Sequence, residues 1–245
     1  MAKTTRLDLA LVERGLTESR EKAKRLIMGG LVSVDGQMVS KADCQVSPET
    51  LITLKETEKY VSRGGYKLEA ALNHFRISVQ GLVCLDVGAS TGGFTDCLLQ
   101  SGADKVHSID VGHGQLAWKL RNDPRVECRE HLNARRLDGE TFVPRPQFAC
   151  VDVSFISLKK ILPPLWKTVE PGANCVALIK PQFEAGREVM NRCRGVLKDR
   201  ALQDAIADEI VRFAVDSGFE SLGLMDSPVT GADGNREFLC ALKKT

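Results

Sequence analysis

The chain has 245 residues, with 34 Lys and Arg against 32 Asp and Glu and a hydrophobic content of 43%. This length predicts one large domain, or a large domain with a small one, and the composition excludes a disordered or collagen-like chain. The longest uninterrupted apolar runs have five residues (175–179 and 238–242), far fewer than the ~20 that cross a bilayer. Because Asp8, Glu13 and Arg14 interrupt the N-terminal segment, it lacks the apolar core of a signal peptide. We therefore expect a cytoplasmic protein.

The cysteines and histidines do not form a recognisable metal-binding pattern. None of the eight cysteines belongs to a CxxC pair, and the four histidines do not form an HExxH motif. Four cysteines lie within apolar runs, where a reduced cysteine behaves as a small hydrophobic residue. We expect no bound metal.

The first part of the chain predicts a small α+β module. Helical spacing of leucines predicts a helix over 6–14, and Ser19 is a suitable N-cap for a second helix that ends before Gly29. Residues 31–39 read as a strand, an Asp-Gly turn and a strand, and 49–54 add another short strand. We place this module at residues 1–58 and a polar linker at 59–63.

The remaining residues, 64–245, alternate between helices and apolar strands. Helices are predicted over 66–75, 93–100, 114–121, 156–166 and 198–217, and strands start near 82, 105, 148 and 173. Such alternation predicts an α/β fold with a doubly wound, largely parallel sheet. The final stretch, 219–243, reads as two strands joined without a helix, which implies an antiparallel last strand.

A glycine-rich turn after the first strand of this sheet predicts a cofactor site. Gly88, Ser90 and Gly93 occupy the three positions of a GxGxxG pattern, and the missing middle glycine disfavours the pyrophosphate of a dinucleotide. Asp110 ends the next strand, where a carboxylate can accept the ribose hydroxyls of adenosine. With Asp86 in the turn as a partner for a cationic ligand, the pattern favours S-adenosylmethionine. A purely structural turn is the alternative.

Four charged residues lie next to apolar segments. Asp152 and Lys180 follow strands, Glu237 precedes the last strand, and Lys67 begins the helix before the first strand. Since ligands bind beyond the carboxyl ends of such strands, the four are candidate catalytic residues. Each could instead cap a helix or extend into water.

Basic residues cluster near the second helix of the small module. These candidates for contacts to RNA phosphates are Arg6, Arg20, Lys22, Lys24 and Arg25. The alternative is a solvated helix face, because Glu18 and Glu21 lie alongside. A second basic group, Arg187, Arg192 and Arg194, is predicted to lie in a loop that closes over the substrate.

A family resemblance runs through VSRGGYKLEAAL (61–72), CLDVGASTGGFTDCLLQSGADKVHSIDVG (84–112), VDVSFISL (151–158), ALIKPQFEAGRE (177–188) and GADGNREFL (231–239). In these strings the chain resembles the TlyA, or hemolysin A, family of ribosomal RNA 2′-O-methyltransferases. The segment 19–36 is similar to the RNA-binding domain named after ribosomal protein S4. The resemblance implies a Rossmann-like, S-adenosylmethionine-dependent, FtsJ-like methyltransferase domain behind an S4-like domain. The implied substrate is a cytidine ribose of 16S or 23S RNA, with ribosomal RNA or a ribosomal subunit as partner and no membrane.

The resemblance also assigns residues. It implies that Lys67, Asp152, Lys180 and Glu237 form the catalytic Lys-Asp-Lys-Glu tetrad. We assign Lys180 to the attacking oxygen, as a neutral base or a cationic orienting group. The cofactor-binding residues that we infer are Asp86, Gly88, Ser90, Gly92, Gly93, Phe94, Asp110, Asn133 and Asp152. Two other functions remain open at this point, a membrane-lytic protein and an NAD-dependent oxidoreductase on the same fold.

Overall fold

The computed structural model describes residues 4–55, 58–138, 140–193, 196–231 and 234–245. The chain divides into two compact units, Met1–Lys59 and Tyr60–Thr245. Each unit has its own hydrophobic core, so each is described by itself.

The N-terminal unit packs two short helices against small strands. Its elements are β1 (Thr5–Arg6), α1 (Leu7–Glu13), α2 (Arg20–Met28), β2 (Val32–Val34), β3 (Gln37–Met38), β4 (Gln45–Val46) and β5 (Ile52–Leu54). Strand β1 pairs with β4, and β2 lies between β3 and β5 in an antiparallel sheet. Ser19 caps α2 by accepting a hydrogen bond from Lys22 N at 3.3 Å, as predicted. Leu7, Leu11 and Ile27 are fully buried in the core of this unit.

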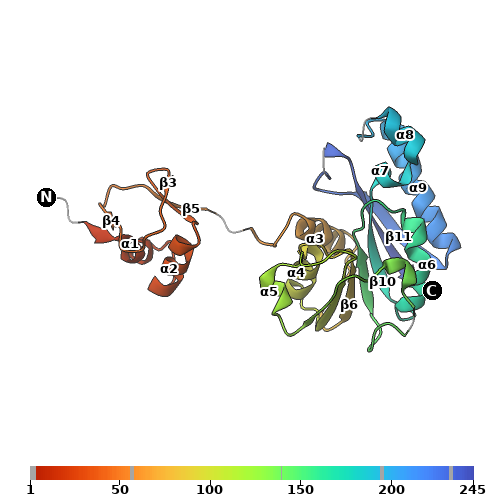
Figure 1. The fold of residues 1–245 in the computed structure, drawn as a ribbon, viewed down its shortest axis with the longest axis horizontal. Helices are drawn as coiled ribbons and strands as arrows, with labels where there is room; N and C mark the ends of the chain where they lie inside the picture. Colours follow the sequence, from red (N-terminus) through yellow and green to blue (C-terminus); the bar gives the residue numbers. More distant parts are fainter. Residues whose placement is uncertain (1–3, 56–57, 139, 194–195, 232–233) are drawn as a thin grey trace. The chain divides into compact units, whose positions relative to one another are not determined.

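The C-terminal unit is built on a seven-stranded sheet with the order β11-β12-β10-β9-β6-β7-β8 (Figure 1). Its strands are β6 (Val83–Val87), β7 (Lys105–Ile109), β8 (Val126–Arg129), β9 (Phe148–Val151), β10 (Asn174–Ile179), β11 (Phe219–Asp226) and β12 (Phe238–Lys244). Strands β6 to β10 are parallel, and β12 runs antiparallel to both β10 and β11. The predicted α/β fold with an antiparallel last strand is confirmed.

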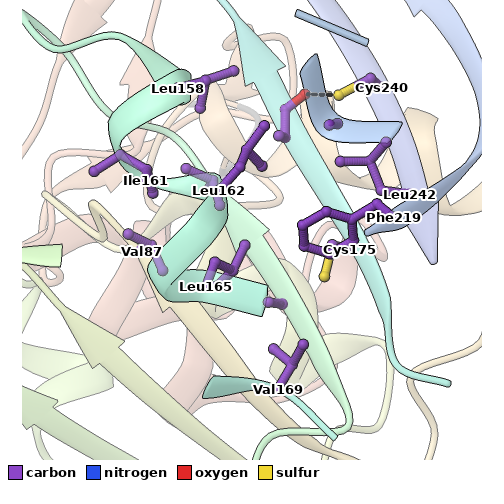
Figure 2. Close-up of a cluster of buried hydrophobic side chains, with 14 of the residues drawn as sticks. Val87, Leu158, Ile161, Leu162, Leu165, Val169, Cys175, Phe219, Cys240 and Leu242 are labelled. Carbon is purple, nitrogen blue, oxygen red and sulfur yellow. Dashed lines mark hydrogen bonds between the residues drawn. The ribbon is translucent and has the colours of Figure 1, made fainter. Parts of the chain in front are cut away.

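Helices cover both faces of this sheet (Figure 1). One face carries α3 (Gly64–His74), α4 (Gly93–Gln100) and α5 (Trp118–Arg121), and the other carries α6 (Leu162–Thr168) and α9 (Arg200–Asp216). Strand β10 shows the period of two, because Cys175, Ala177 and Ile179 pack toward α6 and α9 whereas Val176 and Leu178 pack toward α3 and α4. Figure 2 shows the first of these two cores, in which Leu162 and Leu165 of α6 lie beside Val87.

Several short elements differ from the predicted ones. Strand β8 was not predicted. All four of its residues are half-buried at the sheet edge and two of them carry charge, so the sequence shows no apolar run there. The helix expected over 156–166 divides into a 3₁₀ turn, η2 (Leu158–Lys160), and α6, whose first turn holds two prolines. Short helices α7 (Pro181–Glu184) and α8 (Arg187–Arg192), and the 3₁₀ turn η1 (Ala134–Arg136), were also not predicted.

The helices in the described part of the chain are too short or too polar to cross a membrane.

Candidate active site

The glycine-rich turn between β6 and α4 depends on backbone conformations that only glycine adopts easily. Gly88 has φ +86° and Gly92 has φ +95°. A Cβ atom on Gly88 would lie 2.2 Å from the carbonyl oxygen of Asp152, and one on Gly92 would lie 2.3 Å from Leu120 Cδ1. The turn therefore brings its backbone against the end of β9, where only a residue without a side chain fits.

Asp110 fixes this turn to the end of β7. Its Oδ2 accepts a hydrogen bond from Ser90 N at 2.8 Å, and its Oδ1 accepts one from Gly112 N at 2.7 Å. Each carboxylate oxygen keeps a lone pair for a ligand hydroxyl. Asn133 Oδ1 caps η1 by accepting from Arg135 N at 3.1 Å. The ends of two neighbouring strands thus place polar oxygens beside the turn.

These residues line a cavity of about 350 Å³, which we call the nucleoside cavity. Its walls combine apolar side chains with the polar groups just described. They include Gly88, Ser90, Ile109, Asp110, Leu132, Asn133, Asp152 and Phe155. A mostly apolar cavity with a few convergent polar groups suits a nucleoside.

A second cavity, of about 220 Å³, adjoins the first, and we call it the reaction cavity. Its lining includes Lys67 of α3, the turn 88–91, Gly93, Phe94 and Asp152. Gly88, Ser90 and Asp152 line both cavities, so a ligand could extend from one into the other beside Asp152.

Lys67 and Glu237 form a buried ion pair at the reaction cavity. Lys67 Nζ donates to Glu237 Oε2 at 2.5 Å, and the two side chains are 10% and 3% exposed. A Cβ on Gly231 would lie 2.2 Å from Glu237 Oε1, so the backbone at Gly231 closes over this carboxylate. The close pairing compensates two charges whose separate burial would be costly.

Asp152 and Lys180 form a second lysine–carboxylate pair. Lys180 Nζ lies 2.5 Å from Asp152 Oδ1 and donates to Ser154 Oγ at 2.9 Å. The Asp152 contact lacks hydrogen-bond geometry, so this pair is held mainly by charge. The structure thus groups the four predicted residues into two pairs, and one member of each pair, Lys67 and Asp152, lines the reaction cavity.

Asp86 requires a correction, because it lies within β6 and not in the turn. Its side chain is fully buried and lines neither cavity. Asp86 Oδ2 accepts from Thr95 Oγ1 at 2.7 Å, and burial, together with the nearby charge of Asp152, raises the Asp86 pKa to about 7. The carboxyl faces α4 because residues at alternate strand positions share a face. The geometry therefore gives no support to direct cofactor contact by Asp86.

Phe155 was missed by the sequence analysis. It has φ +62°, its side chain is 91% exposed, and its ring lies 4.9 Å from that of Phe183 between centroids. Phe155 lines the nucleoside cavity, directly follows Ser154 and lies three residues after Asp152. The only signal in the sequence was an aromatic residue close to a candidate catalytic carboxylate, and that pattern does not reveal exposure.

The predicted RNA-binding residues of the N-terminal unit fall into three groups. Arg6 and Arg20 both bind the buried Asp8, with Nε to oxygen distances of 3.0 and 2.8 Å, and these bonds lower the Asp8 pKa to about 2. Lys22 pairs with Glu18 at 3.1 Å. Lys24 and Arg25 are exposed on α2. Arg6 and Arg20 therefore stabilise the fold, whereas Lys24 and Arg25 lie open to a ligand.

The predicted substrate-closing loop lies only in part within the described residues. Residues 187–192 form α8, but the side chains of Arg187 and Arg192, and all of Arg194, lie outside the described residues.

Comparison with known proteins assigns both units. Residues 60–244 match the FtsJ-like methyltransferase family, and residues 5–52 match the S4 domain. Over 245 residues the chain is 44% identical to the 16S/23S rRNA (cytidine-2′-O)-methyltransferase TlyA of Mycobacterium tuberculosis, covering 99% of this chain and 91% of that protein. The chain belongs to the TlyA family of FtsJ-like methyltransferases.

Other members of the TlyA family carry a different name. The chain is 44% identical to hemolysin A of Brachyspira hyodysenteriae, covering 96% of this chain and 98% of that protein. The solved structure of a candidate hemolysin from Streptococcus thermophilus matches with a TM-score of 0.74 and 45% identity, over 100% of this chain and 90% of that one. The family predicted from the sequence is confirmed, and the oxidoreductase alternative is wrong.

For a TlyA-family chain with this geometry, Asp110→Ala is expected to weaken S-adenosylmethionine binding by about 1 to 3 kcal/mol, because a charged acceptor is lost. Calorimetric titration measures this change. The matched control is Asp104→Ala, which removes an exposed carboxylate before the same strand. Equal affinities of the two variants and the wild-type protein would contradict the role of Asp110.

Proposed function

We propose that this protein transfers a methyl group from S-adenosylmethionine to the 2′-hydroxyl of a cytidine in 16S or 23S ribosomal RNA. The observation that carries the proposal is the arrangement of two lysine–carboxylate pairs, Lys67–Glu237 and Asp152–Lys180, beside the glycine-rich turn. The TlyA relative of M. tuberculosis, whose name states this reaction, supports the choice of substrate. With ribosomal RNA as substrate, the protein acts in the cytoplasm.

The residues around the two cavities fit S-adenosylmethionine. The nucleoside cavity offers Asp110 to ribose hydroxyls and apolar walls to adenine, and the turn at Gly88 lets a ligand approach the backbone closely. Asn133 adds a polar group to the same cavity, and Ser90, Gly93 and Phe94 line the reaction cavity. Gly92 lets the turn take its left-handed backbone conformation. When bound, this cofactor supplies an electrophilic methyl group on a sulfonium.

The chain's own residues must then orient the ribose hydroxyl and remove its proton. Lys180 is assigned to the attacking oxygen, and Asp152, 2.5 Å from its ammonium, orients it. Ser154 accepts a hydrogen bond from the same ammonium and so further restricts its position. Lys67 and Glu237 are assigned to holding the ribose at the reaction cavity. Lys180→Arg, which keeps the charge but cannot act as a base at neutral pH, distinguishes a general base from an orienting cation.

Phe155 gives the target base a surface on which to stack. A 2′-hydroxyl inside a folded RNA reaches a cavity only if its nucleotide leaves the neighbouring stack. An aromatic ring that is 91% exposed, next to the catalytic segment, can replace the lost stacking. The proposed function therefore explains an exposure that would otherwise be unfavourable.

We infer a division of labour in which residues 1–58 dock the RNA, 59–63 connect, and 64–245 carry out the chemistry. The separate hydrophobic cores of the two units support this division. The unit boundary in the structure falls between Lys59 and Tyr60, and the Tyr60 side chain is buried in the C-terminal unit.

Radiolabelled methyl transfer tests the proposed function. The protein and labelled S-adenosylmethionine are incubated with 16S RNA, 23S RNA and each ribosomal subunit in parallel. Label in the RNA of at least one of these substrates supports the proposal. If none of them is labelled while the cofactor binds, ribosomal RNA is not the substrate.

Replacing both Lys24 and Arg25 by Gln is expected to weaken RNA binding and leave cofactor affinity unchanged. The variant neutralises fewer RNA phosphates, so its binding releases fewer counterions. The slope of log affinity against log salt should therefore become shallower by about one to two. Filter binding at several salt concentrations measures the slope. Lys41→Gln, another exposed lysine of the same unit, is the control. An unchanged slope in the double variant would place RNA docking elsewhere.

A further inference from the structure

A cavity of about 740 Å³ lies at the edge of the sheet opposite the active site. It is lined by Asp138, Glu140, Arg145, Trp166, Lys167 and Lys244. Lys244 is the last residue of β12 and lies beside the start of β10, because its neighbour Lys243 pairs with Asn174. Arg145 lies shortly before the start of β9. Asp152 and Lys180 follow the other ends of β9 and β10. This cavity is therefore separate from the two described above.

Lys244 carries a buried positive charge in this cavity. The residue is 6% exposed, and its Nζ donates to the carbonyl oxygen of Val169 at 2.9 Å and lies 4.2 Å from the centre of the Trp166 ring. Within the described residues it forms no ion pair with a carboxylate. Burial, and then the charge of Arg145, lower the Lys244 pKa. The ammonium is thus fixed in place without a countercharge.

Arg145 is a second cation held at the same place. Its Nη2 donates to the carbonyl oxygen of Lys167 at 2.5 Å, and its buried Nε has no hydrogen-bond partner. Of the two carboxylates that line the cavity, Asp138 accepts from Thr141 Oγ1 at 2.6 Å and from Glu140 N at 3.0 Å. Across the described part of the chain, neither Asp138 nor Glu140 forms an ion pair with the cations here.

We propose that this cavity binds a phosphate group between Arg145 and Lys244. A guanidinium and an ammonium held near each other repel, and an anion placed between them turns that repulsion into two attractions. Phosphate oxygens match the donor geometry of arginine, and Arg145 has several donors left. Lys167, exposed at the cavity, adds a third positive charge. The phosphate comes from a free phosphate ion or from a phosphodiester of an RNA strand.

Calorimetric titration with inorganic phosphate at constant ionic strength tests the site without any methyl transfer. We expect saturable binding by the wild-type protein, and binding about tenfold weaker or more in Arg145→Gln and in Lys244→Met, since each loses a charge-assisted contact. Lys244→Met keeps an apolar stem on Trp166, and Arg145→Gln changes a partly exposed residue, so at least one folded variant is available. Lys160→Gln, an exposed lysine of the same unit, should bind as the wild type does.

The affinity of ribosomal RNA for the same variants separates the two sources. If an RNA phosphodiester occupies the site, Arg145→Gln and Lys244→Met weaken RNA binding, and each makes its salt slope shallower by about one. If a free phosphate is the ligand, phosphate binding weakens and RNA affinity does not change. The proposal is overturned if wild-type protein shows no saturable phosphate binding and both variants keep wild-type RNA affinity. It is also overturned if phosphate binds equally well to all four proteins and RNA affinity does not change.

Discussion

Lys180→Ala is expected to lower the turnover of RNA methylation by about 10² to 10⁴-fold, because a positioned group that moves or orients a proton typically contributes this much. Lys180 Nζ is held by Asp152 and Ser154 at the end of β10, so no neighbouring lysine of the described site can take its exact place. Single-turnover methylation with saturating RNA measures the change. Cofactor affinity should stay within a factor of two or so, since the nucleoside cavity does not include Lys180.

Two further variants define what Lys180 does. Lys180→Arg keeps a cation but cannot act as a base at neutral pH, so partial recovery of turnover indicates an orienting role and no recovery indicates a base. Lys160→Ala is the control. It removes an exposed lysine at the end of η2 and should leave turnover unchanged. Wild-type single-turnover rates in Lys180→Ala would show that the four charged residues do not form a catalytic group.

Lys67→Met is expected to lower the free energy of unfolding by about 3 to 5 kcal/mol, because it leaves the carboxylate of Glu237 buried without its partner. Glu237 is 3% exposed, and the backbone at Gly231 closes over it, so water has little access to replace the lost ammonium. Denaturant unfolding followed by circular dichroism measures the loss. Methylation is expected to be lost as well, since Lys67 lines the reaction cavity.

The double variant Lys67→Met with Glu237→Leu separates stability from chemistry. Apolar residues of similar volume often replace a buried ion pair without loss of stability. We expect the double variant to recover most of the unfolding free energy and none of the methylation. The converse result, normal methylation in a stable double variant, would show that the Lys67–Glu237 pair only supports the fold.

Much of the fold follows from the sequence because its strongest signals are local. Apolar runs such as 175–179 form strands covered on both faces, and the absence of a helix between the last two strands predicted their antiparallel pairing. The sequence did not predict strands that form only because they pair at the edge of a sheet. Strand β8 is half-buried and two of its four residues are charged. Strands β1 and β4 have two residues each and are strands because they pair with each other.

The site was predictable where position along a strand fixes position in space. Asp152 and Lys180 follow adjacent parallel strands, which brought them together as expected. Asp86 was wrongly placed in the turn, because the local sequence does not mark the residue at which β6 ends. Arg6 and Arg20 resembled phosphate ligands, yet both bind Asp8, a carboxylate whose complete burial no local pattern reveals.

The position of the transferred methyl group shows whether the protein methylates a ribose hydroxyl or a base. Ribosomal RNA labelled by the wild-type protein is digested with alkali, which cannot cleave a phosphodiester next to a 2′-O-methyl group, and the protected dinucleotide is identified by mass spectrometry. The proposed function predicts label on the ribose of a cytidine, and about 10² to 10⁴-fold slower labelling of the protected dinucleotide with Lys180→Ala. Label on a base, released by alkali as a single nucleotide, would contradict it.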